Sequence, residues 1–262
     1  YANIVVKNLV NLVYTPMLLS FVGQADYGVF QTSNSFVFSL TLLTFGFSEA
    51  YIRFYTQEKA KGDECDIRRL NGMYLMLYIV VCAVALSLGL LFSANVTTFF
   101  AGSFTSEQGG LAGELMAIMS FNVAATLFST VFDAYILAHE QFKFQQSRQM
   151  FTSLATPGVA FVLLNVGMGA VGVAVAQLAV TLTLLVLNAR FAIVKLGMKF
   201  DISRFDGSLF RAIAAFSAWI FGNQVCDLVN QSVPNMILGA LSGAVAVSVF
   251  AVSINIRGIF VS

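Results

Sequence analysis

The sequence has few charged residues, few cysteines and a single histidine, and each shortage argues against a class of protein. Only 10% of the 262 residues are charged, whereas soluble domains contain about 25%. Cys65, Cys82 and Cys226 lie far apart without a paired spacing, so neither a disulfide framework nor a zinc site is indicated. His139 is the only histidine, and we interpret it as a solvated loop residue because no catalytic or metal-binding partner lies near it in the sequence. The aromatic residues form no basic platform for nucleic acid, and no HExxH motif is present. We therefore expect no enzyme, no catalytic residue, no metal and no nucleic-acid partner.

Apolar residues dominate instead. They make up 58% of the chain, and the mean hydropathy is +0.82, which is typical of a protein whose solvent is a bilayer. A membrane span needs about 20 mainly apolar residues. Runs of this kind lie near residues 1–22, 27–52, 71–94, 112–137, 149–168, 171–194, 209–232 and 236–262. The sequence thus predicts an all-α fold, a polytopic membrane bundle of eight helices.

Lysine and arginine occur at every second connection. The connections at 23–26, 95–110, 165–172 and 239–243 contain neither residue. The intervening connections, at 56–70, 139–148 and 195–208, carry or adjoin most of the basic residues: Arg53, Lys59, Lys61, Arg68, Arg69, Lys143, Arg148, Arg190, Lys195, Lys199, Arg204 and Arg211. Because cytoplasmic loops are enriched in basic residues, we predict a cytoplasmic N-terminus.

An internal repeat relates the two ends of the chain. Residues 1–42 align without a gap with residues 221–262. The polar residues Asn3, Lys7 and Asn11 match Asn223, Asp227 and Gln231, and both sets have the i, i+4, i+8 spacing of one helix face. Parallel repeats build transporters with the substrate site at the repeat interface. We therefore predict that these six residues face a shared cavity.

Several of these residues have an alternative interpretation. Lys7 can reach the cytoplasmic interface by snorkelling, whereas the short Asp227 carboxylate needs a cation, a proton or water. Arg53 can bind a substrate phosphate or simply anchor the cytoplasmic end of its helix. Gln31 and Asn34 belong to a polar patch that faces either the cavity or a neighbouring helix. Asn122 is similar, and Asp133 lies close enough to the predicted cytoplasmic side to be an interface residue.

Four segments carry a resemblance to a known family. They are "NLVYTPMLLSFVGQADYGVF" (11–30), "FGFSEAYIRFY" (45–55), "AYILAHEQFKFQQSRQM" (134–150) and "KLGMKFDISRFD" (195–206). The sequence resembles the bacterial polysaccharide-export flippases, the O-antigen-type flippases of the MOP (multidrug/oligosaccharidyl-lipid/polysaccharide) superfamily. The resemblance implies a MATE-like arrangement of two six-helix lobes around a cavity that opens alternately to each side. On this basis residues 1–206 form one complete lobe, and residues 207–262 begin a second. The chain starts at Tyr1 inside an apolar run, so we expect it to be part of a longer protein.

The resemblance also implies a function. The expected cargo is an oligosaccharide on a polyprenyl pyrophosphate, moved from the cytoplasmic to the outer leaflet of the bacterial inner membrane for surface polysaccharide biosynthesis. A drug/cation antiporter of the same superfamily is the alternative. No cofactor is expected, although transport can be coupled to H⁺ or Na⁺. The expected partners are the lipid-linked oligosaccharide and membrane lipid. We expect a monomer, with association with a polysaccharide polymerase or glycosyltransferases as an open alternative.

Overall fold

The computed structural model describes the backbone of residues 2–44, 46–62, 64–100, 104–202, 207–231 and 233–261. The side chains of these residues are described except for residues 2–9, 11, 64, 97, 99, 209, 227, 228, 231 and 255–261. The described chain is helical: α1 (Ala2–Val22), α2 (Gln24–Phe38), η1 (Ser39–Thr44), α3 (Phe47–Lys61), α4 (Glu64–Ala94), α5 (Val96–Phe99), α6 (Ser106–Ala138), α7 (Phe142–Asn165), α8 (Gly169–Arg190), η2 (Phe191–Lys195), α9 (Gly207–Gln231), α10 (Val233–Ser242) and α11 (Ala244–Val261).

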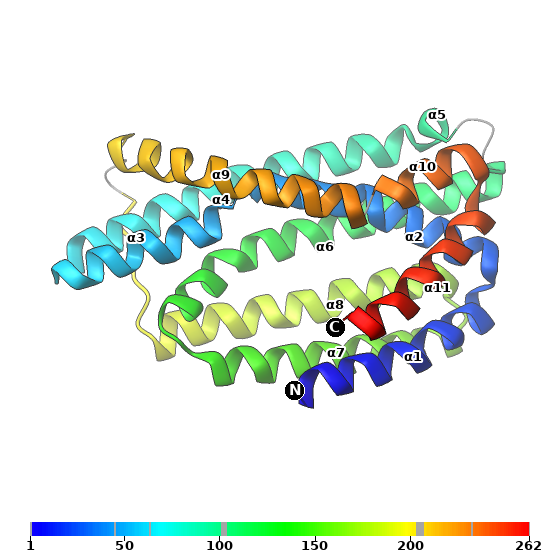
Figure 1. Ribbon diagram of the computed structural model, residues 1–262, viewed down its shortest axis with the longest axis horizontal. Coiled ribbons are helices and arrows are strands. Elements are labelled where there is room, and N and C mark those ends of the chain that lie inside the picture. Colours follow the sequence, from blue (N-terminus) through cyan, green and yellow to red (C-terminus); the bar gives the residue numbers. More distant parts are fainter. Residues whose placement is uncertain are drawn as a thin grey trace.

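These elements form a bundle whose members run along its long axis (Figure 1). Several elements continue one another, so that α2, η1 and α3 form one bent rod, as do α8 and η2. In the described chain, four rods are long and apolar enough to cross a membrane: Gln24–Lys61, Cys65–Ala94, Ser106–Ala138 and Gly169–Lys195. The described chain is an all-helical bundle with rods of membrane-spanning length, as the sequence predicts.

The two ends of the bundle differ in charge. The α1–α2, α4–α5, α7–α8 and α10–α11 turns lie at one end, on the right in Figure 1, and their sequences contain no lysine or arginine. The end of α3, the start of α4, the α6–α7 connection and residues 196–202 lie at the opposite end, and lysines and arginines cluster there. We call this second end the basic end.

Helix α6 lies inside the bundle and packs against α2, α3, α4 and α8. Its residues contribute to two clusters of buried side chains. Leu115 and Met119 belong to the cluster near the turn of α1 and α2, whereas Val131 belongs to a cluster with Tyr51 and Tyr74 toward the basic end. On the outside, many large apolar side chains are exposed, among them Val80, Leu91, Val162, Val186 and Trp219. An apolar outer surface of this extent is suited to lipid rather than water.

Three predicted boundaries are wrong. The predicted connection at 56–70 is almost entirely helical, since α3 continues to Lys61 and α4 begins at Glu64. The predicted connection at 139–148 is short, because α7 begins at Phe142. The predicted last span, 236–262, is broken at Gly243, so that residues 236–242 belong to α10 and only α11 follows the turn. In the first two cases hydropathy identifies only the membrane-embedded part of a helix, and polar helical turns extend beyond it. In the third case a glycine turn interrupts one continuous apolar run.

The turn glycines agree with the internal repeat. Gly23 ends α1 with φ 86°, and Gly243 ends α10 with φ 80°. These two positions correspond in the alignment of 1–42 with 221–262. A positive φ is unfavourable for any residue with a Cβ, so each turn requires glycine. The repeat therefore extends from the polar helix faces to the backbone of the turn that follows.

Helices α2 and α11, which correspond in the repeat, pack against each other. The contact is close because Gly28 has no side chain: a Cβ at this position would overlap the carbonyl oxygen of Ala244. Next to it, the buried Asn235 of α10 donates a hydrogen bond to the Ser35 hydroxyl across 3.0 Å. When an element contacts its own repeat copy, both lie near the axis that relates the two repeats.

Candidate functional site

The predicted cavity residues are only partly within the described structure. Five of them have side chains that lie outside the described residues: Asn3, Lys7, Asn11, Asp227 and Gln231. Their shared cavity stays a prediction. Asn223 is described and is exposed on α9. Its neighbour Gln224 accepts a hydrogen bond from the Thr44 hydroxyl, with 3.3 Å between the oxygens.

Gln31, Asn34 and Arg53 are described, and they lie along the α2–η1–α3 rod. Gln31 is half-buried and donates a hydrogen bond to the Tyr27 hydroxyl across 2.7 Å, and Asn34 is half-buried as well. Arg53 is exposed, and its guanidinium carbon lies 4.4 Å from the ring centroid of Phe216 on α9. Arg53 thus contacts the start of the predicted second lobe through a cation–π interaction.

A polar stripe on α6 is the first site that the sequence analysis missed as a whole, although it named two of its residues, Asn122 and Asp133. Asn122, Thr126, Thr130 and Asp133 follow the i, i+4, i+8, i+11 spacing of one helix face, and they extend over about 16 Å at 1.5 Å per residue. The Asn122 side-chain oxygen is buried without a hydrogen-bond partner. We call this set the α6 stripe. The same spacing rule that singled out Lys7 would have found it in the sequence.

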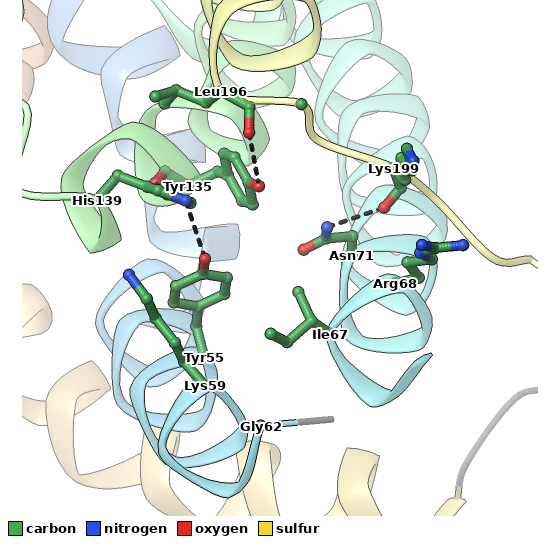
Figure 2. Close-up of a pocket in the computed structure, with 11 residues that line it drawn as sticks. Tyr55, Lys59, Gly62, Ile67, Arg68, Asn71, Tyr135, His139, Leu196 and Lys199 are labelled. Carbon is green, nitrogen blue, oxygen red and sulfur yellow. Dashed lines mark hydrogen bonds between the residues drawn. The ribbon is translucent and has the colours of Figure 1, made fainter. Parts of the chain in front are cut away.

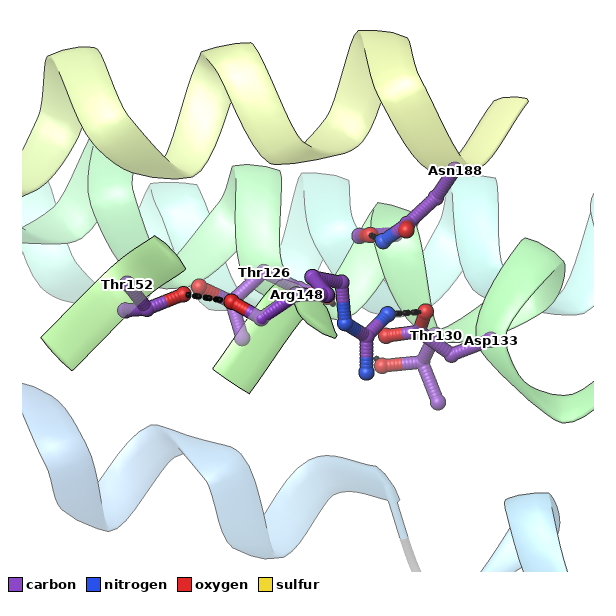
Figure 3. A network of polar contacts seen from close by, with 7 residues as sticks. Thr126, Thr130, Asp133, Arg148, Thr152 and Asn188 are labelled. Atoms are coloured by element: carbon purple, nitrogen blue, oxygen red, sulfur yellow. Dashed lines mark hydrogen bonds and ion pairs between the residues drawn. The ribbon is translucent and has the colours of Figure 1, made fainter. Parts of the chain in front are cut away.

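An ion pair closes the α6 stripe at the basic end. Arg148 of α7 donates a hydrogen bond to the Asp133 carboxylate (Figure 3). The side chain of Arg148 is 17% exposed and that of Asp133 is 31% exposed. Asp133 lies about 8 Å inside the end of α6, and Arg148 about 9 Å inside the start of α7. The two charges are therefore held between helices, and the prediction of a simple interface role for Asp133 is incomplete.

Neutral side chains surround this pair (Figure 3). The Thr152 hydroxyl donates to the Arg148 carbonyl across 3.0 Å, and the buried Asn188 amide of α8 donates to the Ser129 hydroxyl across 2.8 Å. These bonds satisfy polar groups between α6, α7 and α8, where water is scarce. The arrangement holds one charge of each sign between α6 and α7.

A pocket at the basic end is the second site that the sequence analysis missed. It has a volume of about 510 Å³ and lies between the end of α3, the start of α4, the end of α6 and the segment 196–199 (Figure 2). Three cationic residues line it, namely Lys59, Arg68 and Lys199. We call it the basic pocket. Its walls come from segments far apart in the sequence, so no local sequence motif predicts this pocket.

His139 lines the basic pocket, and its interpretation as a solvated loop residue is wrong. The ring is half-buried; Nδ1 lies 2.9 Å from the Tyr135 carbonyl oxygen and Nε2 lies 3.0 Å from the Tyr55 hydroxyl. A carbonyl only accepts, so Nδ1 carries the proton, and in the neutral ring Nε2 accepts from Tyr55. Burial lowers the pKa of His139 from its ordinary value of 6.5, and the charge of Lys59 lowers it further, whereas the bond to Tyr135 acts in the opposite direction.

The sequence of the chain matches a known protein family. A family model described as polysaccharide biosynthesis protein matches residues 2–262. The chain belongs to this family. The match confirms the resemblance to a polysaccharide biosynthesis family, and it covers nearly the whole chain. Among curated protein sequences, none matches this chain significantly.

Two solved structures share the fold of this polysaccharide biosynthesis protein. The MATE multidrug transporter DinF-BH, solved in complex with a ligand, superposes with a TM-score of 0.75 at 16% sequence identity. A MOP superfamily transporter from Pyrococcus furiosus superposes with a TM-score of 0.58, also at 16% identity. In both cases 98% of this chain is covered, but only 58% and 57% of the other chain. The chain thus spans little more than half the length of these two structurally similar proteins.

Proposed function

We propose that the protein is a secondary transporter that flips a polyprenyl-pyrophosphate-linked oligosaccharide from the cytoplasmic to the outer leaflet. The observation that carries this proposal is the match of the polysaccharide biosynthesis family over residues 2–262 on a fold shared with MATE-type transporters. Membership in the family supports a saccharide cargo, and the fold supports transport rather than catalysis.

The charges of the described chain support an anionic cargo. Arg53 is exposed beside α9, and basic residues gather at one end of the bundle, where a pyrophosphate would be met first if this end is cytoplasmic. A pyrophosphate carries several negative charges, and guanidinium and ammonium groups bind it through charge-assisted hydrogen bonds. The Arg148–Asp133 pair offers a carboxylate that can exchange its partner during the cycle.

Lys7 and Asp227 are the proposed cargo and coupling residues of the cavity. Two unit charges 4 Å apart attract by about 4 kcal/mol at an effective dielectric near 20, before the cost of desolvation. In this proposal the empty carrier holds the pair, and the pyrophosphate displaces Asp227 from Lys7. The released carboxylate then takes up H⁺ or Na⁺, so that Asp227→Asn weakens ion dependence more than it weakens cargo binding.

The test is a flipping assay with the full-length protein in proteoliposomes. A fluorescent lipid-linked oligosaccharide in the inner leaflet becomes accessible to a membrane-impermeant quencher only when it is flipped. We expect flipping with the wild type and none with empty vesicles. Counterflow of a cationic dye, without movement of the saccharide lipid, would contradict the proposal and support the drug/cation antiporter instead.

Orientation is tested separately, because it decides the direction of transport. In a full-length variant without native cysteines, a single cysteine at Ser106 should react with an impermeant maleimide added to intact cells. A cysteine at Lys61 should react only after the cells are permeabilised. The reverse result would place the basic end outside and invert the proposed direction.

A further inference from the structure

The basic pocket combines positive charges from three separate parts of the chain. Lys59 belongs to the last turn of α3, Arg68 to the first turns of α4, and Lys199 to the segment after η2. None of the described residues that line the pocket is acidic. Three cationic side chains around one hollow create a positive electrostatic potential, which attracts anions.

Neutral hydrogen-bonding groups complete the lining. The Tyr55 hydroxyl, the Tyr135 hydroxyl and His139 face the pocket between α3 and α6 (Figure 2). While His139 is neutral, Tyr55 donates its proton to Nε2. When His139 is protonated, Nε2 donates to Tyr55, and the phenolic proton becomes available to another acceptor. The Tyr135 hydroxyl donates to the Leu196 carbonyl oxygen across 3.4 Å, so the ammonium and guanidinium groups are the donors that remain for phosphate oxygens.

The backbone that carries Lys199 is fixed onto the helices. The buried Asn71 amide of α4 donates to the Lys199 carbonyl across 2.9 Å, while its oxygen accepts from the Tyr51 hydroxyl across 2.6 Å. The Asp201 amide donates to the Arg68 carbonyl across 2.9 Å. Lys199 is therefore held in place at the rim of the pocket, which distinguishes it from a lysine on a freely solvated loop.

The position of the pocket separates it from the proposed transport cavity. All of its lining residues precede residue 200, so it lies within the first predicted lobe and not between the lobes. Its volume of about 510 Å³ falls in the range of about 300–1,000 Å³ that is common for small-molecule sites. An ordinary cytoplasmic loop rich in lysine explains the charge, but not the convergence of three segments on one hollow of this size.

We propose that the basic pocket binds a phosphate-bearing anion. The ligand joins Lys199, on the segment that leads to the second lobe, to Lys59 and Arg68 on the first lobe. Its phosphate comes either from a soluble phosphate compound or from the headgroup of an anionic phospholipid at this end of the bundle. Both sources present the same oxygens to the same donors, and the experiment distinguishes them.

The test uses the full-length protein in nanodiscs. In neutral phosphatidylcholine nanodiscs, inorganic pyrophosphate is titrated by calorimetry; in a second arm, phosphatidylglycerol replaces part of the neutral lipid and the thermal midpoint is measured. Variants Lys59→Gln and Lys199→Gln are compared with Lys195→Gln. The control lysine lies four residues from Lys199 and near the ring of Phe191, with Nζ 5.0 Å from the centroid, and does not line the pocket.

We expect at least one arm to respond in the wild type and in Lys195→Gln. Each pocket variant should weaken pyrophosphate binding by about tenfold, the effect of losing one charge-assisted hydrogen bond, or should abolish the rise of the midpoint with phosphatidylglycerol. A response to pyrophosphate identifies a soluble ligand, and a response only to the lipid identifies a headgroup. No response in either arm, or an equal loss in Lys195→Gln, overturns the proposal. None of these measurements depends on transport, so a failed flipping assay and an empty pocket remain distinguishable.

Discussion

Replacing Asp133 by asparagine tests whether the Arg148–Asp133 pair stabilises the bundle. The substitution keeps the shape of the side chain and removes its charge, which leaves the mostly buried Arg148 guanidinium without a counter-charge. Breaking a fully buried pair costs about 3–5 kcal/mol. Because the Asp133 side chain is 31% exposed, solvent screens part of this loss, and we expect about 2 kcal/mol.

A loss of this size is measurable. Because the shift becomes smaller as the chain becomes longer, about 2 kcal/mol lowers the thermal midpoint of the full-length protein by about 2–4 °C. The midpoint is measured by circular dichroism on the full-length protein in detergent. Arg148→Lys keeps the charge but loses the planar guanidinium, so it should lower the midpoint less than Arg148→Gln does.

The double variant Asp133→Asn/Arg148→Gln decides the interpretation. Removing both charges leaves no unpaired ion, so its midpoint should lie clearly above the value expected from adding the two single losses, with a coupling of about 1–2 kcal/mol. Strictly additive losses would refute the reasoning, because they would mean that the two side chains stabilise the bundle independently.

Three further predictions concern other parts of the structure. Lys7→Ala should abolish flipping by the full-length protein at normal expression, and Lys7→Arg should retain part of it; unchanged polysaccharide export by Lys7→Ala would return Lys7 to the snorkelling interpretation. Since burial lowers the pKa of His139, the unfolded chain binds this proton more tightly, so stability should decrease as the pH falls below about 6.5. A melting series between about pH 7.5 and pH 5.5 should therefore slope less in His139→Asn. Gly28→Val should separate α2 from α11 and lower the thermal midpoint, whereas Gly158→Val, which has open space around its Cβ, should leave the midpoint within about 1 °C; equal midpoints for the two would contradict a close backbone contact at Gly28.

The sequence predicts the membrane-embedded part of this fold well, because apolar runs and turn glycines act locally. The turns at Gly23 and Gly243 are where the repeat places them. The polar helical ends were predicted wrongly for a physical reason. The segment around 56–70 is too polar for a membrane, yet the ion pairs of Lys61 with Glu58 and of Arg69 with Asp66 lie at the i, i+3 spacing that favours a helix.

The sites differ in how far they can be predicted. The α6 stripe can be predicted from the helical spacing of its residues. It is easily overlooked because two of them, Thr126 and Thr130, have only small hydroxyl side chains. The basic pocket is not visible, since its residues come from α3, α4, α6 and the segment after η2. His139 shows the same limit: its partner Tyr55 is 84 residues away, and only the fold brings the two rings together.

The close approach of Gly28 to Ala244 has a mechanical consequence. Two backbones that touch through a glycine can rotate about the contact with little side-chain repacking, so this point can serve as a fulcrum. The path along α2, η1 and α3 from Gly28 to Lys61 is about 50 Å long. A rotation of about 10° at the fulcrum displaces the far end by about 9 Å and Arg53, about 38 Å along the path, by about 6 Å. The latter displacement is enough to break the 4.4 Å contact of Arg53 with Phe216. A small rotation at the Gly28 contact is thereby amplified along the rod into a larger displacement at the basic end.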